Sequence, residues 1–209
     1  MKVYLQLIIL LFLSKIAHAA TVYVDVNGSN PTPPYSSWNM ASTTIQDAVI
    51  AASEGDTILV TNGVYRLTSE IVVDKTTEIR SVNGPDVTIV TGQTYSRVFN
   101  FGSSGSTLSG LSVTEGYSVG NGGGVFASDT SSVITNCIVY NNTAVNWGGG
   151  IYKCSTYNCD IISNESGSRG GGVCEGVIYN STLKSNIVAN VGGDGGAAYD
   201  CELYSSIIK

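Results

Sequence analysis

Short runs of β-branched and aliphatic residues, separated by Gly, Asn, Ser and Thr, dominate the chain from residue 21 onward. The alternating segment TVYVDV (21–26) predicts a strand, and a Pro/Gly/Ser/Asn-rich loop follows it at 27–39. Five further short strands are predicted between residues 56 and 92: DTILV, NGVY, SEIVV, TEIRSV and DVTIVTG. The pattern is therefore that of an all-β chain.

One segment, 43–54, predicts a helix instead. Its apolar residues recur at helical spacing and fall on one face: Ile45, Ala48, Val49 and Ala52. Thr43 or Thr44 can cap its start, and Gly55 is expected to end it.

From about residue 101 to 209 the sequence repeats with a period of 22 to 26 residues, and this half holds 20 of the 25 glycines. An Asn column, a Cys/Ser column, a second Asn column and an aliphatic column keep the same register. Their members are Asn136, Asn158, Asn180 and Ser205; Cys137, Cys159, Ser181 and Ser206; Asn142, Asn164 and Asn186; and Val139, Ile161, Leu183 and Ile208. Glycine runs accompany the units at 122–125, 148–151, 170–173 and 195–198, and 108–116 matches 134–142 at an offset of 26.

A repeat of this period indicates a solenoid. A leucine-rich repeat would place leucines at fixed positions, whereas this chain uses runs of β-branched residues. We therefore expect a right-handed parallel β-helix with three short strands in each turn. Residues in register should stack at the strand spacing of about 4.8 Å. Asn136, Asn158 and Asn180 should form an amide ladder in which each side chain bonds the next, and the 43–54 helix should cap the N-terminal end.

The stretch from 21 to 65 resembles the N-terminal part of exported bacterial proteins of the pectin lyase-like superfamily, which have this fold. The pattern "IQ.A…A..GD.I.V..G.Y" is matched by Ile45, Gln46, Ala48, Ala52, Gly55, Asp56, Ile58, Val60, Gly63 and Tyr65. The GGG[IV] and NC.I..N units are similar to repeats of polymorphic outer-membrane and adhesin-like surface proteins. The resemblance implies either a polysaccharide lyase or hydrolase or a non-enzymatic surface protein. The Asn-Thr-Asp, Asp-Asp, His-Gly and Arg-Ile-Lys motifs of the family's hydrolases are missing.

The first 19 residues have the pattern of a signal peptide. Lys2 supplies a positive charge, Leu5 to Leu13 is apolar, and Ala17-His18-Ala19 is an A-x-A cleavage site. We therefore expect a β-helix domain at 20–209 that is secreted or exposed on a bacterial cell surface, with no transmembrane segment in the mature chain. Because the sequence stops in mid-turn at SSIIK, we also expect that a C-terminal part is missing.

The mature chain would carry 8 basic and 16 acidic residues, a net charge of −8, so nucleic acid is excluded as an expected partner. Its only histidine, His18, lies in the signal peptide, which excludes histidine-based catalysis and histidine-ligated zinc. We expect no metal and no cofactor. The expected partner is a polysaccharide or a host or cell-surface glycan.

Five cysteines remain: Cys137, Cys154, Cys159, Cys174 and Cys201. An exported protein can oxidise its thiols, but an odd number leaves at least one unpaired. Cys137 and Cys159 are neighbours in register, whereas Cys154 and Cys201 lie two turns apart, beyond disulfide reach. Packing as small apolar residues is the favoured interpretation, and the disulfide state stays open.

The charged residues Lys153, Glu175 and Asp200 fall in one column, at offsets of 22 and 25. They are either an ion-pair ladder at the surface, the favoured interpretation, or part of a glycan or acid/base site. Tyr152 and Tyr199 stand beside them and are further candidate substrate-binding residues. A column of Tyr157, Tyr179 and Tyr204 can serve as a sugar platform or as a structural ladder. Without a recognisable catalytic set, the favoured function is a non-catalytic scaffold for adhesion or glycan contact.

Overall fold

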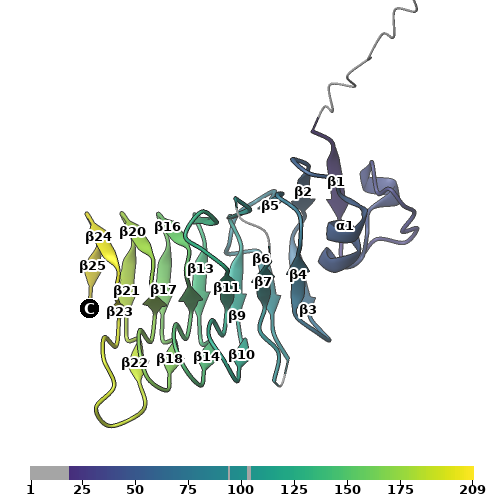
Figure 1. Ribbon diagram of the computed structural model, residues 1–209. Helices are drawn as coiled ribbons and strands as arrows, with labels where there is room; N and C mark the ends of the chain where they lie inside the picture. The colour runs from purple at the N-terminus through teal and green to yellow at the C-terminus, as the bar shows by residue number, and fades with distance from the viewer. Residues whose placement is uncertain (1–18, 94, 103–104) are drawn as a thin grey trace, which may run out of the picture.

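The computed structural model describes residues 19–93, 95–102 and 105–209, and the predicted signal peptide at 1–19 lies outside them except for Ala19. Parallel strands coil into a solenoid, with the helix at one end and the C-terminus at the other (Figure 1). The predicted all-β right-handed parallel β-helix is therefore confirmed. No helix in these three ranges is long and apolar enough to cross a membrane.

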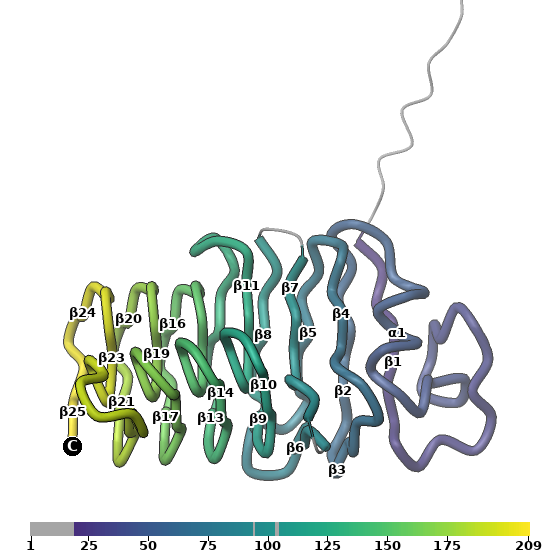
Figure 2. Tube along the Cα trace, turned by 60° about the horizontal axis from the view of Figure 1, so that its bottom comes forward, coloured from purple at the N-terminus to yellow at the C-terminus, as the bar shows by residue number. Residues whose placement is uncertain are grey.

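The described residues form four parallel sheets along the solenoid, and Figure 2 shows how their strands stack from turn to turn. The eight-stranded sheet contains β1 (Thr21–Val24), β2 (Thr57–Val60), β5 (Glu78–Ser81), β8 (Thr107–Ser109), β12 (Val133–Thr135), β16 (Ser155–Tyr157), β20 (Val177–Tyr179) and β24 (Glu202–Tyr204). The seven-stranded sheet contains β3 (Gly63–Arg66), β6 (Thr88–Thr91), β9 (Ser112–Thr114), β13 (Ile138–Tyr140), β17 (Asp160–Ile162), β21 (Thr182–Lys184) and β25 (Ile207–Ile208).

The other two sheets are shorter. The six-stranded sheet contains β4 (Ile71–Val73), β7 (Phe99–Phe101), β11 (Val125–Ala127), β15 (Ile151–Tyr152), β19 (Val173–Cys174) and β23 (Ala198–Tyr199). The four-stranded sheet contains β10 (Tyr117–Ser118), β14 (Thr143–Ala144), β18 (Glu165–Ser166) and β22 (Ile187–Val188). The prediction of three strands per turn is therefore wrong for the repeat region, where a fourth strand of two residues forms between the seven-stranded and six-stranded sheets.

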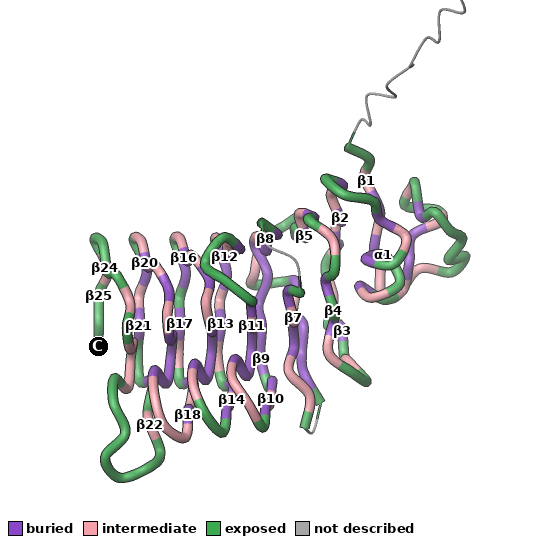
Figure 3. Tube along the Cα trace, viewed as in Figure 1, coloured by how far each residue is buried: buried purple, intermediate pink, exposed green. Residues whose placement is uncertain are grey.

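The predicted aliphatic column is confirmed by the strand register. Val139 pairs with Ile161, Ile161 with Leu183, and Leu183 with Ile208. The first three side chains are fully buried, whereas Ile208, on the last turn, is 56% exposed. Figure 3 shows the same change from buried to exposed along the solenoid. One apolar core thus runs inside the coil and is open at the last turn.

The outer Asn column forms the corner between the eight-stranded and seven-stranded sheets. Asn136, Asn158 and Asn180 have φ of 52°, 52° and 44°, in the left-handed region that Asn tolerates. The predicted continuous ladder is wrong in part, because only one of its two bonds forms, from Asn180 Nδ2 to Asn158 Oδ1 at 2.7 Å. The exposed amides can bond to water instead, so backbone geometry explains this column better than the ladder does.

The second Asn column is the continuous ladder. Asn142 Nδ2 donates to Asn164 Oδ1, and Asn164 Nδ2 donates to Asn186 Oδ1, both at 3.0 Å. The same oxygens accept the backbone N–H of the preceding turn, at 3.1 and 2.9 Å. Asn142 and Asn164 are fully buried. Because these amides satisfy backbone groups as well as one another, they fix the spacing of successive turns from within.

The glycine runs form the corner that leads into the six-stranded sheet. Gly170 has φ of +57°, and a Cβ on Gly171 would collide with the carbonyl oxygens of Ile187 and Gly196. Only glycine allows the backbones of successive turns to approach this closely.

The capping helix α1 (Ile45–Ala51) packs against β1, β2 and β4. A short 3₁₀ helix, η1 (Trp38–Met40), precedes it in the chain. The side chain of Thr44 accepts the Asp47 N–H at 3.1 Å and so caps the start of α1. The helix ends before the predicted residue 54, because Ala52 is already extended, with ψ of 153°.

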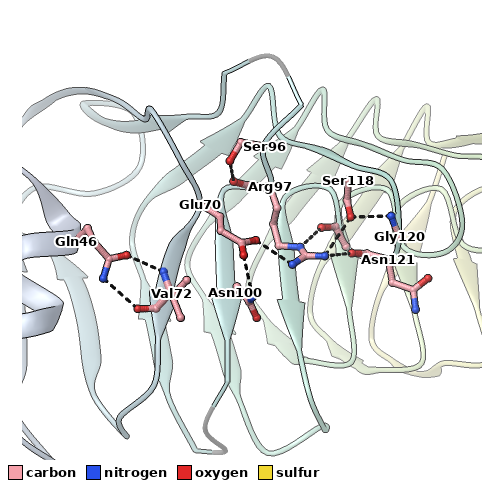
Figure 4. A network of polar contacts seen from close by, with 10 residues as sticks. Gln46, Glu70, Val72, Ser96, Arg97, Asn100, Ser118, Gly120 and Asn121 are labelled. Carbon is pink, nitrogen blue, oxygen red and sulfur yellow. Dashed lines mark hydrogen bonds and ion pairs between the residues drawn. The ribbon is translucent and has the colours of Figure 1, made fainter.

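Two side chains join α1 to the first turns. Lys75 Nζ donates to the carbonyls of Ile50 and Ala52, at 2.9 and 2.8 Å, at the helix C-terminus. Gln46 bonds both backbone groups of Val72 on β4, accepting the N–H at 2.8 Å and donating to the carbonyl at 3.2 Å (Figure 4). Gln46 thereby takes the place of a further strand at the edge of the six-stranded sheet.

Candidate functional site

Two of the five predicted site residues, Tyr152 and Tyr199, lie on the six-stranded sheet. Along each strand one side chain points into the core and the next points outward. The outward positions that align through the pairing of β11, β15, β19 and β23 are Phe126, Tyr152, Cys174 and Tyr199. Phe126 and Tyr152 stack with their ring centroids 5.5 Å apart, and Tyr152 is buried. The face is thus partly aromatic, but the Tyr152 ring is covered rather than offered to a ligand.

The charged column follows directly after these strands, at the corner that leads into the eight-stranded sheet. Lys153, Glu175 and Asp200 have φ of 55°, 54° and 51°, respectively. The N–H of Lys153 bonds the carbonyl of Cys174, and the N–H of Glu175 bonds that of Tyr199, each at 3.0 Å. The predicted column therefore exists, and each member holds a left-handed backbone that is uncommon for such side chains.

Two members of the column interact directly. Lys153 Nζ lies 3.3 Å from Glu175 Oε2, with side chains 32% and 28% exposed. The hydroxyl of Tyr152 donates to Glu175 Oε1 at 3.2 Å, and Lys153 Nζ lies 5.3 Å from the centroid of the Tyr152 ring. The hydrogen bond to Glu175 raises the pKa of Lys153, and burial raises the pKa of Tyr152. Neither group is prepared to act as a base near neutral pH.

Asp200, by contrast, is exposed and makes no ion pair with a described residue. It lines an open depression together with Thr130, Glu175, Gly176, Val177, Cys201 and Glu202. Among the described residues, the depression is lined by several carboxylates and by no Lys or Arg. It therefore does not assemble the predicted set of one lysine and two carboxylates.

A second column on this face was missed by the sequence reasoning. Trp147, Arg169 and Asp194 are joined by parallel bridges just before the glycine runs. The guanidinium carbon of Arg169 lies 5.3 Å from the centroid of the Trp147 ring and 4.8 Å from that of the Tyr199 ring. Arg169 is half-buried, and within the described ranges its side chain has no hydrogen-bond or ion-pair acceptor. Its donors are thus available to a ligand while its position is held by two rings.

Arg97 provides a contrast on the same face. Its guanidinium lies 4.8 Å above the ring of Phe126 and donates to Glu70 Oε2 at 2.9 Å. It also bonds the side chain of Ser118 and the carbonyls of Asn121 and Gly122, at 3.0, 2.8 and 2.9 Å (Figure 4). Burial lowers the pKa of Arg97, and pairing with Glu70 opposes this effect. Arg97 therefore ties neighbouring turns together and has few donors left for a ligand.

The tyrosine column on the eight-stranded sheet is a stack of rings. The centroids of Tyr157 and Tyr179 lie 4.9 Å apart, and those of Tyr179 and Tyr204 lie 4.5 Å apart, with interplanar angles of 2° and 9°. Because the inner ring faces cover one another, a sugar would meet mainly their edges. This geometry supports the structural interpretation of the column.

All five cysteines are free thiols, and four are buried. Cys137 and Cys159 stack as expected, with Cys137 N 3.4 Å from Cys159 Sγ. Both belong to the apolar core with Cys154, and Cys201 packs against it. Cys174 instead lies on the outer side of its strand, between Tyr152 and Tyr199. Packing as small apolar residues is thus confirmed for the three core cysteines.

A cavity of about 300 Å³ lies at the capped end, between α1 and β3. Its lining includes Gln46, Asp47, Tyr65 and Arg66. It contains none of the predicted site residues, so it is separate from the face described above.

Comparisons with known proteins bear on the fold. No protein-family model matches the chain, and no curated protein sequence matches it. Among solved structures, a pectin methylesterase mutant in complex with a hexasaccharide aligns with a TM-score of 0.62 and 13% identity, over 92% of this chain and 67% of its own. A pectate lyase aligns with a TM-score of 0.60 and 19% identity, over 92% of this chain and 64% of its own. This chain thus spans about two thirds of the length of each, and it adopts the pectin lyase-like parallel β-helix fold that both proteins share.

Proposed function

We propose that the chain is an exported, non-catalytic protein that binds a polysaccharide along the outer face of the six-stranded sheet. The proposal rests on Arg169, whose guanidinium lies between the Trp147 and Tyr199 rings and has no hydrogen-bond or ion-pair acceptor among the described residues. An aromatic ring offers a sugar an apolar surface, and a guanidinium offers a carboxylate two parallel hydrogen bonds. The proposed ligand is therefore a glycan that carries carboxylate groups.

The net charge of the mature chain opposes an anionic ligand unless the surface provides a local exception. Glu70 neutralises Arg97 and Glu175 neutralises Lys153, each through an ion pair. Arg169 is then the one cation on this face whose charge is not already paired within the described residues. A single site of this kind implies weak binding per sugar.

Two proteins with this fold bear names that refer to pectin, and one of them holds a hexasaccharide. At identities of 13% and 19%, the similarity shows a shared fold and does not show a shared function. We nevertheless choose a pectin-derived polysaccharide as the first probe.

Isothermal titration calorimetry with polygalacturonate, and with a neutral polysaccharide of similar length, would test the proposal. We expect binding of the charged polymer only, and a loss of at least tenfold in affinity in Arg169→Ala. Arg80→Ala is the matched control, because Arg80 is an exposed arginine on the eight-stranded sheet. Equal affinities of wild type and Arg169→Ala would rule out this surface.

The alternative function, a polysaccharide lyase or hydrolase, rests on the column of Lys153, Glu175 and Asp200. The ion pair and the raised pKa of Lys153 argue against a lysine base. Incubation with polygalacturonate, followed by absorbance at about 235 nm and by reducing-end assay, separates the functions. Turnover that is lost in Lys153→Met and Glu175→Gln would overturn the non-catalytic proposal.

A further inference from the structure

Asp56 is a carboxylate at the capped end whose charge is unpaired by any described residue. It is only 6% exposed. Its Oδ2 accepts the N–H of Ser53 at 2.7 Å, just beyond the end of α1, and its Oδ1 accepts the N–H of Ala20 at 2.7 Å. The ion pairs among the described residues do not include it. A buried carboxylate that meets only neutral amides lacks the compensation that burial of a charge requires.

Ala20 is the residue that follows the A-x-A cleavage motif at Ala17-His18-Ala19. Its carbonyl accepts the N–H of Thr57 at 2.9 Å, and the ladder continues at once with Thr21 paired to Thr57. The position of Ala20 N is therefore fixed from both sides, by the Asp56 side chain and by the β1–β2 pairing. Ala19 and Ala20 are exposed, so burial does not shield the bond between them.

We propose that cleavage between Ala19 and Ala20 creates the cation that Asp56 lacks, so that the new N-terminal ammonium of Ala20 forms an ion pair with Asp56 and locks the first turn of the β-helix. Cleavage is a hydrolysis by a signal peptidase. The hydroxyl of water goes to the Ala19 carbonyl and a hydrogen goes to the Ala20 nitrogen. A proton from solvent then converts that amine to an ammonium, because an α-amino group titrates near pH ~8.

This inference concerns maturation and is independent of glycan binding. Processing would exchange a neutral donor for a charged one at the same 2.7 Å contact, and charge-assisted hydrogen bonds are the stronger kind. Because the same carboxylate holds Ser53, the pair would also secure the end of the capping helix against β1 and β2. The exported form should therefore be more stable than the unprocessed one.

The test compares the mature chain that starts at Ala20 with a chain that starts at Ala19. Both are cut from a fusion protein by a protease that leaves the chosen alanine as the N-terminal residue. We expect the Ala20 form to unfold at a temperature higher by about 2–8 °C at pH 7. An ion pair with Asp56 would raise the pKa of the Ala20 α-amino group above its unfolded value of about 8. The stabilisation is then present below the unfolded pKa and lost as pH rises through the folded pKa, so the difference in unfolding temperature should close above about pH 9. N-terminal sequencing of the exported protein should give Ala20.

Asp56→Asn should abolish the difference between the two forms, and Asp74→Asn, at an exposed position, should leave it intact. If Asp56→Asn does not fold, the pH dependence of the wild-type pair still decides. Three results would each overturn the proposal. They are equal unfolding temperatures for the chains that begin at Ala19 and Ala20, a difference in unfolding temperature that is independent of pH, and an exported chain that begins at another residue.

Discussion

The guanidinium carbon of Arg169 lies 4.8 Å from the centroid of the Tyr199 ring, one turn further along the solenoid. Trp147 flanks the same guanidinium from the preceding turn at 5.3 Å. Three successive turns thus contribute one residue each to a single surface feature. A solenoid suits such a surface, because equivalent positions repeat at the strand spacing of about 4.8 Å and a linear polymer can follow them.

The buried Asn ladder should contribute more to the stability of the repeat region than the outer Asn column does. Asn164→Ala removes bonds to Asn142, Asn186 and the carbonyl of Val139, and it leaves buried partners unsatisfied. We expect a loss of about 3 kcal/mol or more in the free energy of unfolding, measured by urea denaturation. Asn158→Gly is the matched control, because it keeps the left-handed corner and removes one exposed bond. A smaller cost for Asn164→Ala than for Asn158→Gly would contradict the assigned roles.

The glycine corners should tolerate no side chain where successive turns meet. A Cβ on Gly171 would collide with two backbone oxygens, so Gly171→Ala should destabilise the fold by several kcal/mol or prevent folding. Gly102→Ala should be nearly neutral, since its nearest atom would be the Val73 oxygen at 3.7 Å. Thermal unfolding followed by circular dichroism compares the two. Similar behaviour of both variants would mean that the glycine run is not required for close packing.

The side chain of Gln46 should protect the first edge of the six-stranded sheet. Gln46→Leu keeps the size of the side chain but leaves the N–H and carbonyl of Val72 without their partner. We expect a loss of about 1–3 kcal/mol in stability and an increased tendency to aggregate, measured by urea denaturation and light scattering. Gln93→Leu, an exposed glutamine away from the cap, should show neither effect.

The thiols should react slowly with iodoacetamide. Burial raises the pKa of Cys174 to about 12 and that of Cys201 to about 11, so the reactive thiolate is scarce at pH 8. Half-buried Cys201 should be alkylated first, and the other four only on unfolding. Because these pKa values lie above that of an unfolded thiol, their contribution to stability should fall as pH rises beyond about 8.5. Rapid labelling of more than one thiol in native protein, seen by mass spectrometry, would contradict this.

Register along the solenoid could be predicted from sequence because the repeat offsets of 22 and 25 fix which residues stack. The offsets correctly placed Lys153 and Glu175 on successive turns, where they form an ion pair. They could not show that Asp200 does not join this pair. The column of Trp147, Arg169 and Asp194 has the same offsets, and it was missed because its three residue types share no chemistry. Position before a glycine run was the signal that could have identified it.

Two errors of the fold prediction have similar local causes. The fourth strand has only two residues in each turn, which is too short for an alternating pattern to be visible. The helix ends before Gly55 because Lys75 occupies its last carbonyls and Asp56 binds the N–H of Ser53. Both partners lie outside the helical segment, so its own sequence does not reveal them.

Trp147 offers the most direct test of the proposed binding surface. The chain has two tryptophans, and Trp38 lies at the capped end, so Trp38→Phe leaves Trp147 as the only indole probe. Titration of this variant with oligogalacturonate should give a saturable change in emission. The same titration of Trp38→Phe combined with Arg169→Ala should give no such change. An emission that stays constant in the first variant, while the polymer binds by calorimetry, would place the ligand elsewhere and contradict the account.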